Sequence, residues 1–248
     1  QTDRLRVELD HFKSSDYRNF YEPSDDTWLF TDGLEKDVSF IVSMLSSTCT
    51  TATTEEEEQR SSLNVSVEVG SGSGYVTTFL MKLLMRHDLC HNALVMNQMF
   101  FFCTDINPHA TSATFQTLKH NGVPMSHVDV VQTSFTSALM PRNRNKARIL
   151  LFNPPYVPSE EDELGHDDCH AAYAGGRDGR EVIDEFLPLV KHILTHKSSV
   201  CYMIAIEDNK PRELMEIMSR EEYGSFQSSV VMKKKVLGEI LYLLKFVR

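Results

Sequence analysis

The feature that most constrains the fold is a repeated order of elements, in which a short apolar strand leads into a turn and the turn into a helix. The stretch LNVSVEVGSGSGYVTTFLMKLLM (63–85) alternates apolar residues, turns on glycines and then shows helical apolar spacing. The stretch MFFFCTDINPHATSATFQTLKHNG (99–122) repeats this order, and Pro108 and Gly122 mark the start and the end of its helix. Strands that alternate with helices predict a mostly parallel sheet with helices on both faces, which is an α/β fold.

The rest of the chain continues this pattern. A helix capped by Ser24 or Asp25 is predicted to run through Val42, because its apolar residues fall on one face. The last two strands are predicted to be adjacent and antiparallel, joined at Leu237-Gly238. The remaining predictions are strands at 127–135, 147–156, 198–208, 225–236 and 239–248, and helices at 181–196 and 210–222.

Length and composition favour one globular domain. The chain has 248 residues, of which 41% are hydrophobic and 24% charged, and this is enough to build one large core. We expect a single domain over 1–248, with a flexible lead-in over 1–20. The stretch 46–62 is almost free of apolar residues and includes a run of glutamates, so we expect a disordered insertion there. A second insertion or long connection is expected at 86–98.

Charge and cysteine content limit the partners and the compartment. The net charge is −10 and the one dense basic run is 233–235, which argues against a nucleic-acid partner. No apolar run reaches the roughly 18 residues of a membrane span, and no signal-peptide pattern is found. The 5 cysteines are scattered and form no CxxC pair, which indicates a reducing compartment. We therefore expect a cytoplasmic protein, with the nucleus as a second location.

The glycine turn EVGSGSG predicts a cofactor site. Gly70, Gly72 and Gly74 lie where a strand passes into a helix, so a ligand can approach the backbone closely. Asp105 ends the next strand, where a carboxylate can accept both hydroxyls of a ribose, as in NAD, FAD or S-adenosylmethionine. The spacing is not the GxGxxG that seats a pyrophosphate, and the Glu68 carboxylate would attract an ammonium group. These charges favour S-adenosylmethionine.

The string ILLFNPPYVP predicts the catalytic turn. It places Asn153 at the end of a strand, followed by Pro154, Pro155 and Tyr156. The prolines stiffen the turn and carry no N–H, so the Asn153 side chain and the Pro154 carbonyl can accept the two hydrogens of a flat NH₂ group. Tyr156 can stack on that group. Such a grip holds the nitrogen lone pair towards a methyl donor, and no strong base is required before attack.

The residues alone leave the substrate open. An amide and the adenine of DNA both carry a planar NH₂, although the chain lacks a basic track for DNA. Lysine fits less well, because its nitrogen is not flat and must first lose a proton. A cofactor-binding scaffold without catalysis is a further reading, against which the intact Asn-Pro-Pro-Tyr set argues.

Several motifs together resemble the eukaryotic branch of the HemK-type glutamine methyltransferases. They are YEPSDDTWLFTDGLE, VEVGSGSG, CTDINPHA, LLFNPPYVP, AGGRDGREVIDEFLPLV and the final LLKFVR. The resemblance implies a class I methyltransferase fold, a Rossmann-like α/β fold with a seven-stranded, mostly parallel sheet and an antiparallel terminal strand. It also implies methylation of the glutamine amide nitrogen in the Gly-Gly-Gln motif of a class 1 translation release factor.

The resemblance also implies roles for single residues. Thr27 would lie at the methionine end of the cofactor, and Asn153 would orient the substrate amide. Ser134 stands where the family often has Asp near the adenine. Arg177 is a candidate substrate contact. The full cofactor set is Thr27, Glu68, Gly70, Gly72, Gly74, Asp105, Ile106, Ser134, Phe135 and Asn153, and the substrate set is Asn153, Tyr156 and Arg177.

Proteins of this branch also work with a small zinc-binding activator subunit. In the class I strand order the strand HVDVV would lie at an edge of the sheet, where an uncovered apolar strand is a liability. We therefore expect the activator to pair with Val128–Val131 by strand addition. No metal site is expected in the chain itself, because HDDCH (166–170) matches no standard zinc spacing.

Overall fold

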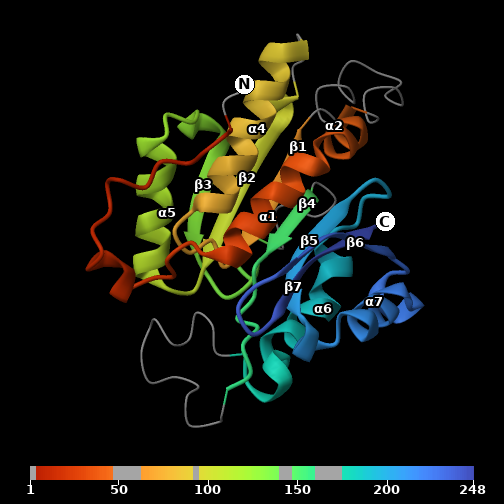
Figure 1. The fold of residues 1–248 in the computed structure, drawn as a ribbon. Helices are drawn as coiled ribbons and strands as arrows, with labels where there is room; N and C mark the ends of the chain where they lie inside the picture. Colours follow the sequence, from red (N-terminus) through yellow and green to blue (C-terminus); the bar gives the residue numbers. More distant parts are fainter. Residues whose placement is uncertain (1–3, 47–62, 92–94, 140–146, 160–174) are drawn as a thin grey trace.

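The sheet has seven strands. The computed structural model describes residues 4–46, 63–91, 95–139, 147–159 and 175–248 (Figure 1). The strand order is β3-β2-β1-β4-β5-β7-β6. The strands are β1 (Asn64–Val69), β2 (Met99–Asp105), β3 (Val128–Gln132), β4 (Ala147–Phe152), β5 (Val200–Ile206), β6 (Gln227–Lys235) and β7 (Ile240–Val247).

The prediction of a mostly parallel sheet with an antiparallel terminal strand is confirmed. The strands from β3 to β5 pair in parallel, whereas β7 pairs antiparallel with both β5 and β6. The antiparallel strand therefore lies inside the sheet, and β6 takes one edge. Strands β1, β4 and β5 are buried along their whole length, because helices cover both faces of the sheet.

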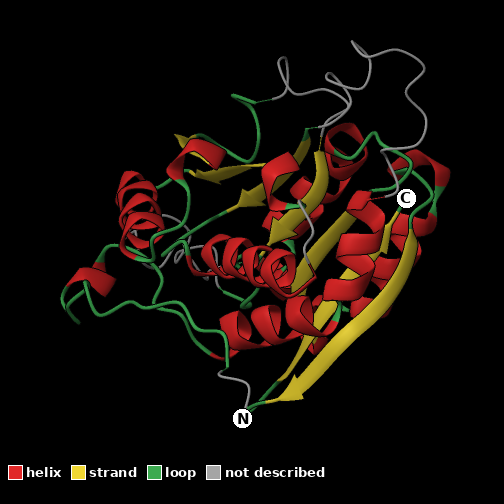
Figure 2. Ribbon diagram, turned by 90° about the horizontal axis from the view of Figure 1, so that it is seen from above, coloured by secondary structure: helices red, strands yellow, loops and turns green. Residues whose placement is uncertain are grey.

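Helices cover the sheet on two sides (Figures 1 and 2). Helices α1, α4 and α5 form one layer, in which α4 contacts both of the others, while α6 and α7 lie on the opposite face. Within the described residues no helix is long and apolar enough to cross a membrane. The helices are α1 (Asp25–Lys36), α2 (Val38–Ser46), α4 (Tyr75–His91), α5 (Pro108–His120), α6 (Glu181–Ile193) and α7 (Pro211–Ser219).

Two predicted boundaries differ in the structure. The helix expected through Val42 is divided into α1 and α2 at Asp37, whose carboxylate accepts hydrogen bonds from Tyr202 and Lys245. The connection expected at 86–98 is partly helical, because α4 continues to His91 with a partly buried face that the residue pattern did not reveal. The insertion expected at 46–62 lies, apart from Ser46 at the end of α2, outside the described residues.

Residues 4–20, which belong to the expected flexible lead-in, pack against the domain in the structure. Val7 is buried, and the Glu8 amide donates to the side chain of Asn121 just after α5. The rings of Phe12, Tyr17 and Phe20 pack against one another and against two alanines of α5. We call residues 4–20 the strap. Its contacts have no helical or strand period, so its apolar residues gave no recognisable pattern in the sequence.

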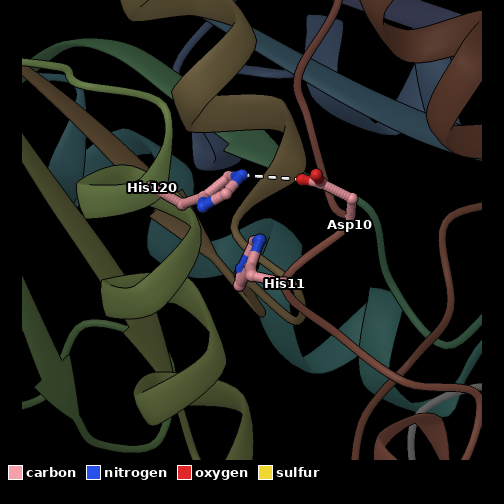
Figure 3. A group of neighbouring side chains, drawn as sticks. All are labelled: Asp10, His11 and His120. Atoms are coloured by element: carbon pink, nitrogen blue, oxygen red, sulfur yellow. Dashed lines mark hydrogen bonds and ion pairs between the residues drawn. The ribbon is translucent and has the colours of Figure 1, made fainter.

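A cluster of three side chains holds the strap to the end of α5 (Figure 3). His120 Nε2 lies 2.7 Å from Asp10 Oδ1, and the His11 ring stacks on the His120 ring with centroids 4.3 Å apart. These residue types can bind metals. One potential ligand atom of each residue lies within 4.8 Å of the others. Because the cluster joins Asp10 and His11 to His120, it fastens the strap to the end of α5.

Candidate functional site

A cavity of about 530 Å³ lies at the carboxyl ends of β1, β2 and β4. This is where open α/β sheets bind ligands, and the volume suits a ligand of cofactor size. The structure brings most of the predicted site residues to its wall. They are Thr27, Glu68, Gly70, Gly72, Asp105, Ile106, Ser134, Phe135, Asn153, Pro154, Pro155 and Tyr156.

Two predicted residues are not part of this wall. Gly74 has a φ of +78°, and a Cβ on it would lie 2.7 Å from the Thr114 Cα, so this glycine serves the packing of the loop against α5. Arg177 is exposed, and its amide donates to Glu181 at the start of α6. The assignment of Gly74 to the cofactor stays a prediction. Arg177 lies beside the catalytic turn rather than in the cavity.

Backbone amides of the glycine turn after β1 donate hydrogen bonds to other groups of the protein. The Ser71 N–H donates to the Thr104 carbonyl at 3.0 Å, and the Gly74 N–H donates to the Ser71 carbonyl at 2.7 Å. The Gly72 N–H donates to Asp105 Oδ2 at 2.9 Å. A turn whose amides are satisfied in this way offers few donors to a phosphate. This geometry agrees with the reading of the turn as a site for a ligand without a pyrophosphate.

Glu68 is a buried carboxyl group at the base of the cavity. Its Oε2 accepts a hydrogen bond from the Thr77 amide in the first turn of α4, at 3.0 Å. Burial raises the pKa of Glu68 to about 8, although the contacts with Thr77 oppose the rise. A cationic group in the cavity would favour the ionised form. Glu68 is therefore suited to receive an ammonium group.

Asp105 lies at the end of β2 and orders the turns on either side of it. One carboxylate oxygen accepts from Gly72, and the other accepts from the Asn107 amide at 2.9 Å. Burial raises the pKa of Asp105, and these backbone hydrogen bonds oppose the rise. The carboxylate faces the cavity with further lone pairs, which suits the two hydroxyls of a ribose.

The far wall of the cavity is apolar and flat. Ile106 lies on it with 70% of its surface exposed, and Phe135 faces it from the segment after β3. Phe135 has a φ of +46°, an uncommon conformation for a bulky residue, and its ring contacts Phe152 and Phe186. Ser134 lies beside it. These side chains could hold a planar ring such as adenine.

The Asn-Pro-Pro-Tyr turn, which the sequence predicts to be catalytic, lines another part of the cavity. Asn153 Nδ2 donates to Asp26 Oδ2 at 2.9 Å, and the Tyr156 hydroxyl donates to the same oxygen at 3.1 Å. Asn153 Oδ1 is buried and has no hydrogen-bond partner among the described residues. Within those residues the Pro154 carbonyl also accepts no hydrogen bond. The turn, which lines the cavity, therefore carries two acceptors that have no partner among the described residues.

The segment 175–179 supports this turn from outside. A Cβ on Gly175 would lie 2.7 Å from the Pro155 oxygen, and one on Gly179 would lie 1.9 Å from the Tyr156 oxygen. The buried Asn209 side chain donates to the Tyr156 carbonyl at 2.9 Å. Glycine is required here because two backbone segments are in direct contact. The GGRDG motif thus holds the catalytic turn in place.

Asp26 and Tyr21 are site residues that sequence reasoning missed. Asp26 is 1% exposed and its Oδ2 also accepts from the Tyr21 hydroxyl at 3.1 Å. An acidic residue in the first turn of a helix commonly interacts with the helix dipole, so Asp26 gave no sign of a further role in the sequence. The one available signal was its position directly before Thr27, a predicted cofactor residue.

The cavity fits S-adenosylmethionine by the chemistry of its groups. Glu68 suits the amino group, Asp105 suits the ribose hydroxyls, and Ile106 with Phe135 suits the adenine. The internally satisfied glycine turn agrees with a ligand that has no phosphate.

The chain is similar in sequence to methyltransferases of other organisms. No protein-family model matches the chain. A human protein named Methyltransferase HEMK2 is 32% identical over 238 residues, which cover 96% of this chain and 94% of that protein. The eRF1 methyltransferase catalytic subunit mtq2 of Schizosaccharomyces pombe is 30% identical over 239 residues, covering 94% of this chain and 91% of that protein.

Two solved structures share the fold. The E. cuniculi Mtq2–Trm112 complex, described as responsible for methylation of the eRF1 translation termination factor, has a TM-score of 0.54 at 22% identity. It covers 93% of this chain and 99% of the matched chain. The human METTL16 catalytic domain in complex with an RNA hairpin has a TM-score of 0.50 at 10% identity, covering 93% of this chain and 73% of the matched chain.

Proposed function

Because the chain belongs to the family of the HEMK2 and Mtq2 methyltransferases, we propose that it methylates the glutamine side-chain nitrogen in the Gly-Gly-Gln motif of a class 1 translation release factor. It is an S-adenosylmethionine-dependent methyltransferase. The S. pombe relative is named for methylation of eRF1, which supports the choice of substrate. The observation that carries the proposal is the buried, unpartnered Asn153 Oδ1, an acceptor for a substrate N–H.

The catalytic turn binds the substrate amide through its two acceptors. One hydrogen of the glutamine NH₂ is donated to Asn153 Oδ1 and the other to the Pro154 carbonyl. Two bonds in one plane fix the plane of the amide, so that the lone pair of its nitrogen is directed out of the plane towards the cavity. Both acceptors also stabilise the positive charge that develops on nitrogen during attack. The nitrogen loses its proton after the transfer, so no strong base is needed before it.

Tyr156 completes the grip on the substrate. Burial, followed by the Asp26 charge, raises the pKa of Tyr156, so its hydroxyl keeps its proton and donates to Asp26. The ring is then held in one position and can stack on the flat amide. Its apolar surface also keeps water from the nitrogen.

The cofactor would be held by the other wall of the cavity. Glu68 would hold its amino group, Asp105 its ribose, and Ile106, Ser134 and Phe135 its adenine, with Thr27 near its methionine end. When bound, S-adenosylmethionine supplies an electrophilic methyl group on sulfur.

The proposal includes an activator subunit on the edge of the sheet. The E. cuniculi relative is a complex with Trm112, and β3 of this chain forms the edge next to β2. Val130 and Val131 are only partly buried there. We propose that a small zinc-binding subunit adds a strand to β3. We also propose that the enzyme works in the cytoplasm, with the nucleus as a second location, because its cysteines are scattered and form no CxxC pair.

Methyl transfer from labelled cofactor tests the function. The chain is co-expressed with a Trm112-type subunit and incubated with release factor, with release factor in which the motif glutamine is alanine, and with duplex DNA. We expect label on intact release factor alone. Label on DNA alone, or equal label on the glutamine-free release factor, contradicts the proposal.

Expression without the activator subunit tests the interface. We expect the isolated chain to be poorly soluble or inactive, because the β3 edge is uncovered. A soluble monomer with full activity contradicts the proposed need for a partner.

A further inference from the structure

Asp26 determines how the catalytic asparagine faces its substrate. We propose that Asp26 is a positioning residue, which fixes the orientation of the Asn153 side-chain amide so that its oxygen, and not its NH₂ group, faces the cavity. The inference rests on the proposed function and adds a residue to it. It follows from the contacts of a single buried carboxylate.

The shape of an asparagine side chain does not decide its orientation. The oxygen and the NH₂ group are nearly equal in size, and a half-turn of the amide exchanges them. Only hydrogen-bond partners distinguish the two states. In the structure Asn153 Nδ2 lies 2.9 Å from Asp26 Oδ2. In the reversed state Asn153 Oδ1 would face a carboxylate oxygen, and two buried acceptors would oppose each other.

Asp26 is itself held by several donors. Its Oδ1 accepts from the Thr27 amide at 2.6 Å, and its Oδ2 accepts from the hydroxyls of Tyr21 and Tyr156, both at 3.1 Å. In each of these hydrogen bonds Asp26 is the acceptor. Its side chain is almost completely buried at the start of α1. The carboxylate therefore cannot rotate away or be satisfied by solvent.

The consequence lies on the other side of the Asn153 amide. Because Nδ2 is bonded to Asp26, Oδ1 is the amide atom left without a partner among the described residues, in a side chain that lines the cavity. The reversed amide would present N–H groups to the N–H groups of the substrate. Without Asp26, the Asn153 amide would no longer prefer one orientation. A smaller fraction of the enzyme could then hold the substrate NH₂ group in the right plane, whereas the affinity for the cofactor should change little.

A purely structural role for Asp26, as a helix cap, makes a different prediction. Asp25 is its neighbour in the same first turn of α1, is exposed, and pairs with Lys234 at 2.8 Å. Asp25→Asn makes the same chemical change to the same helix end without touching the catalytic turn. It is the matched control.

The experiment compares Asp26→Asn, Asp25→Asn and wild type as complexes with the activator. For Asp26→Asn we expect kcat on release factor to fall about 10- to 100-fold, as for a misplaced reacting group. KM and the cofactor Kd should change less than about threefold, and Tm little. Asp25→Asn should match wild type. The inference is overturned if Asp26→Asn keeps kcat within threefold, or if its loss follows a weaker cofactor Kd, a lower Tm or the same loss in Asp25→Asn.

A reciprocal exchange provides a rescue test. Asn153→Asp alone places two carboxylates against each other. Asn153→Asp combined with Asp26→Asn restores one donor and one acceptor and leaves an oxygen facing the cavity. We expect the double variant to be more active than Asn153→Asp alone, and an equally inactive double variant counts against the inference. If wild type itself does not methylate release factor, the proposed function fails. If wild type is active and Asp26→Asn is equally active, only this inference fails.

Discussion

The two ends of the cavity differ in how their polar groups are satisfied. At the glycine end, the amides of Ser71, Gly72 and Gly74 and both oxygens of Asp105 have partners within the protein. At the catalytic end, Asn153 Oδ1 is buried and has no partner among the described residues. An unsatisfied buried acceptor costs about 1–3 kcal/mol, so it persists only where the surrounding structure holds it. On the proposed function, the first end binds the cofactor and the second receives the reacting group of the substrate.

The largest effect is expected from removing the unpartnered acceptor. Asn153→Ala should lower kcat on release factor by roughly 10²–10³-fold, as for the loss of one preorganised group that stabilises developing charge. Cofactor Kd, measured by calorimetry, should stay within a few-fold of wild type. A variant that loses cofactor binding together with activity would show that the two ends are not separable.

A similar loss of activity is expected when the catalytic turn is displaced by a substitution in the segment that packs against it. Gly179 has a φ of +64°, and a Cβ there would lie 1.9 Å from the Tyr156 oxygen. Gly179→Ala should reduce activity about 100-fold, because small displacements of reacting groups are costly. Gly122→Ala is the control, since Gly122 has the same φ of +64° and open space around it. Equal effects would assign the loss to backbone strain rather than to contact with the turn.

Substitutions at the glycine end should weaken cofactor binding more than they lower kcat. Asp105→Ala removes the acceptor that orders Gly72 and Asn107. We expect cofactor Kd to rise by about 10-fold or more, the equivalent of about 1.4 kcal/mol. At saturating cofactor, kcat should change less. A fall in kcat with unchanged Kd would reverse the assignment of the two ends.

Glu68 should couple cofactor binding to protons. Its pKa of about 8 means that the free enzyme holds a proton there at pH 7. A bound ammonium favours the ionised carboxylate, so binding should release up to one proton at pH 7. Calorimetry in buffers of different ionisation enthalpy measures this release. Glu68→Gln should abolish it, and proton release that persists in this variant would exclude Glu68 as its source.

The smallest effect is expected from the strap, which borders the cavity through Phe20. His120→Ala removes the pairing with Asp10 and the stacked ring. Cofactor Kd should rise by less than about fivefold, because an exposed pair contributes about 1 kcal/mol at most. Lys119 is an exposed neighbour of His120, and Lys119→Ala should leave the cofactor Kd unchanged. A loss in both variants would indicate a general effect on α5.

The fold and most of the cavity wall could be predicted from the sequence because they depend on local patterns. The periodicity of strands and helices can be recognised from residues that are neighbours in the sequence, and so can turns marked by glycine and proline. The end of α1 at Asp37 could not be predicted, and the partners of the Asp37 carboxylate, Tyr202 and Lys245, lie far along the chain. The strap was missed for the same reason.

The sequence alone determined the α/β architecture, the glycine turn and the Asn-Pro-Pro-Tyr end of a strand. The orientation of the Asn153 amide depends on Asp26, which lies 127 positions away, so it is visible only in the folded protein. The folded protein also shows that Gly74 packs closely against α5. Periodicity reports which face of an element is buried, whereas a hydrogen bond between distant residues exists only after the sheet has brought them together.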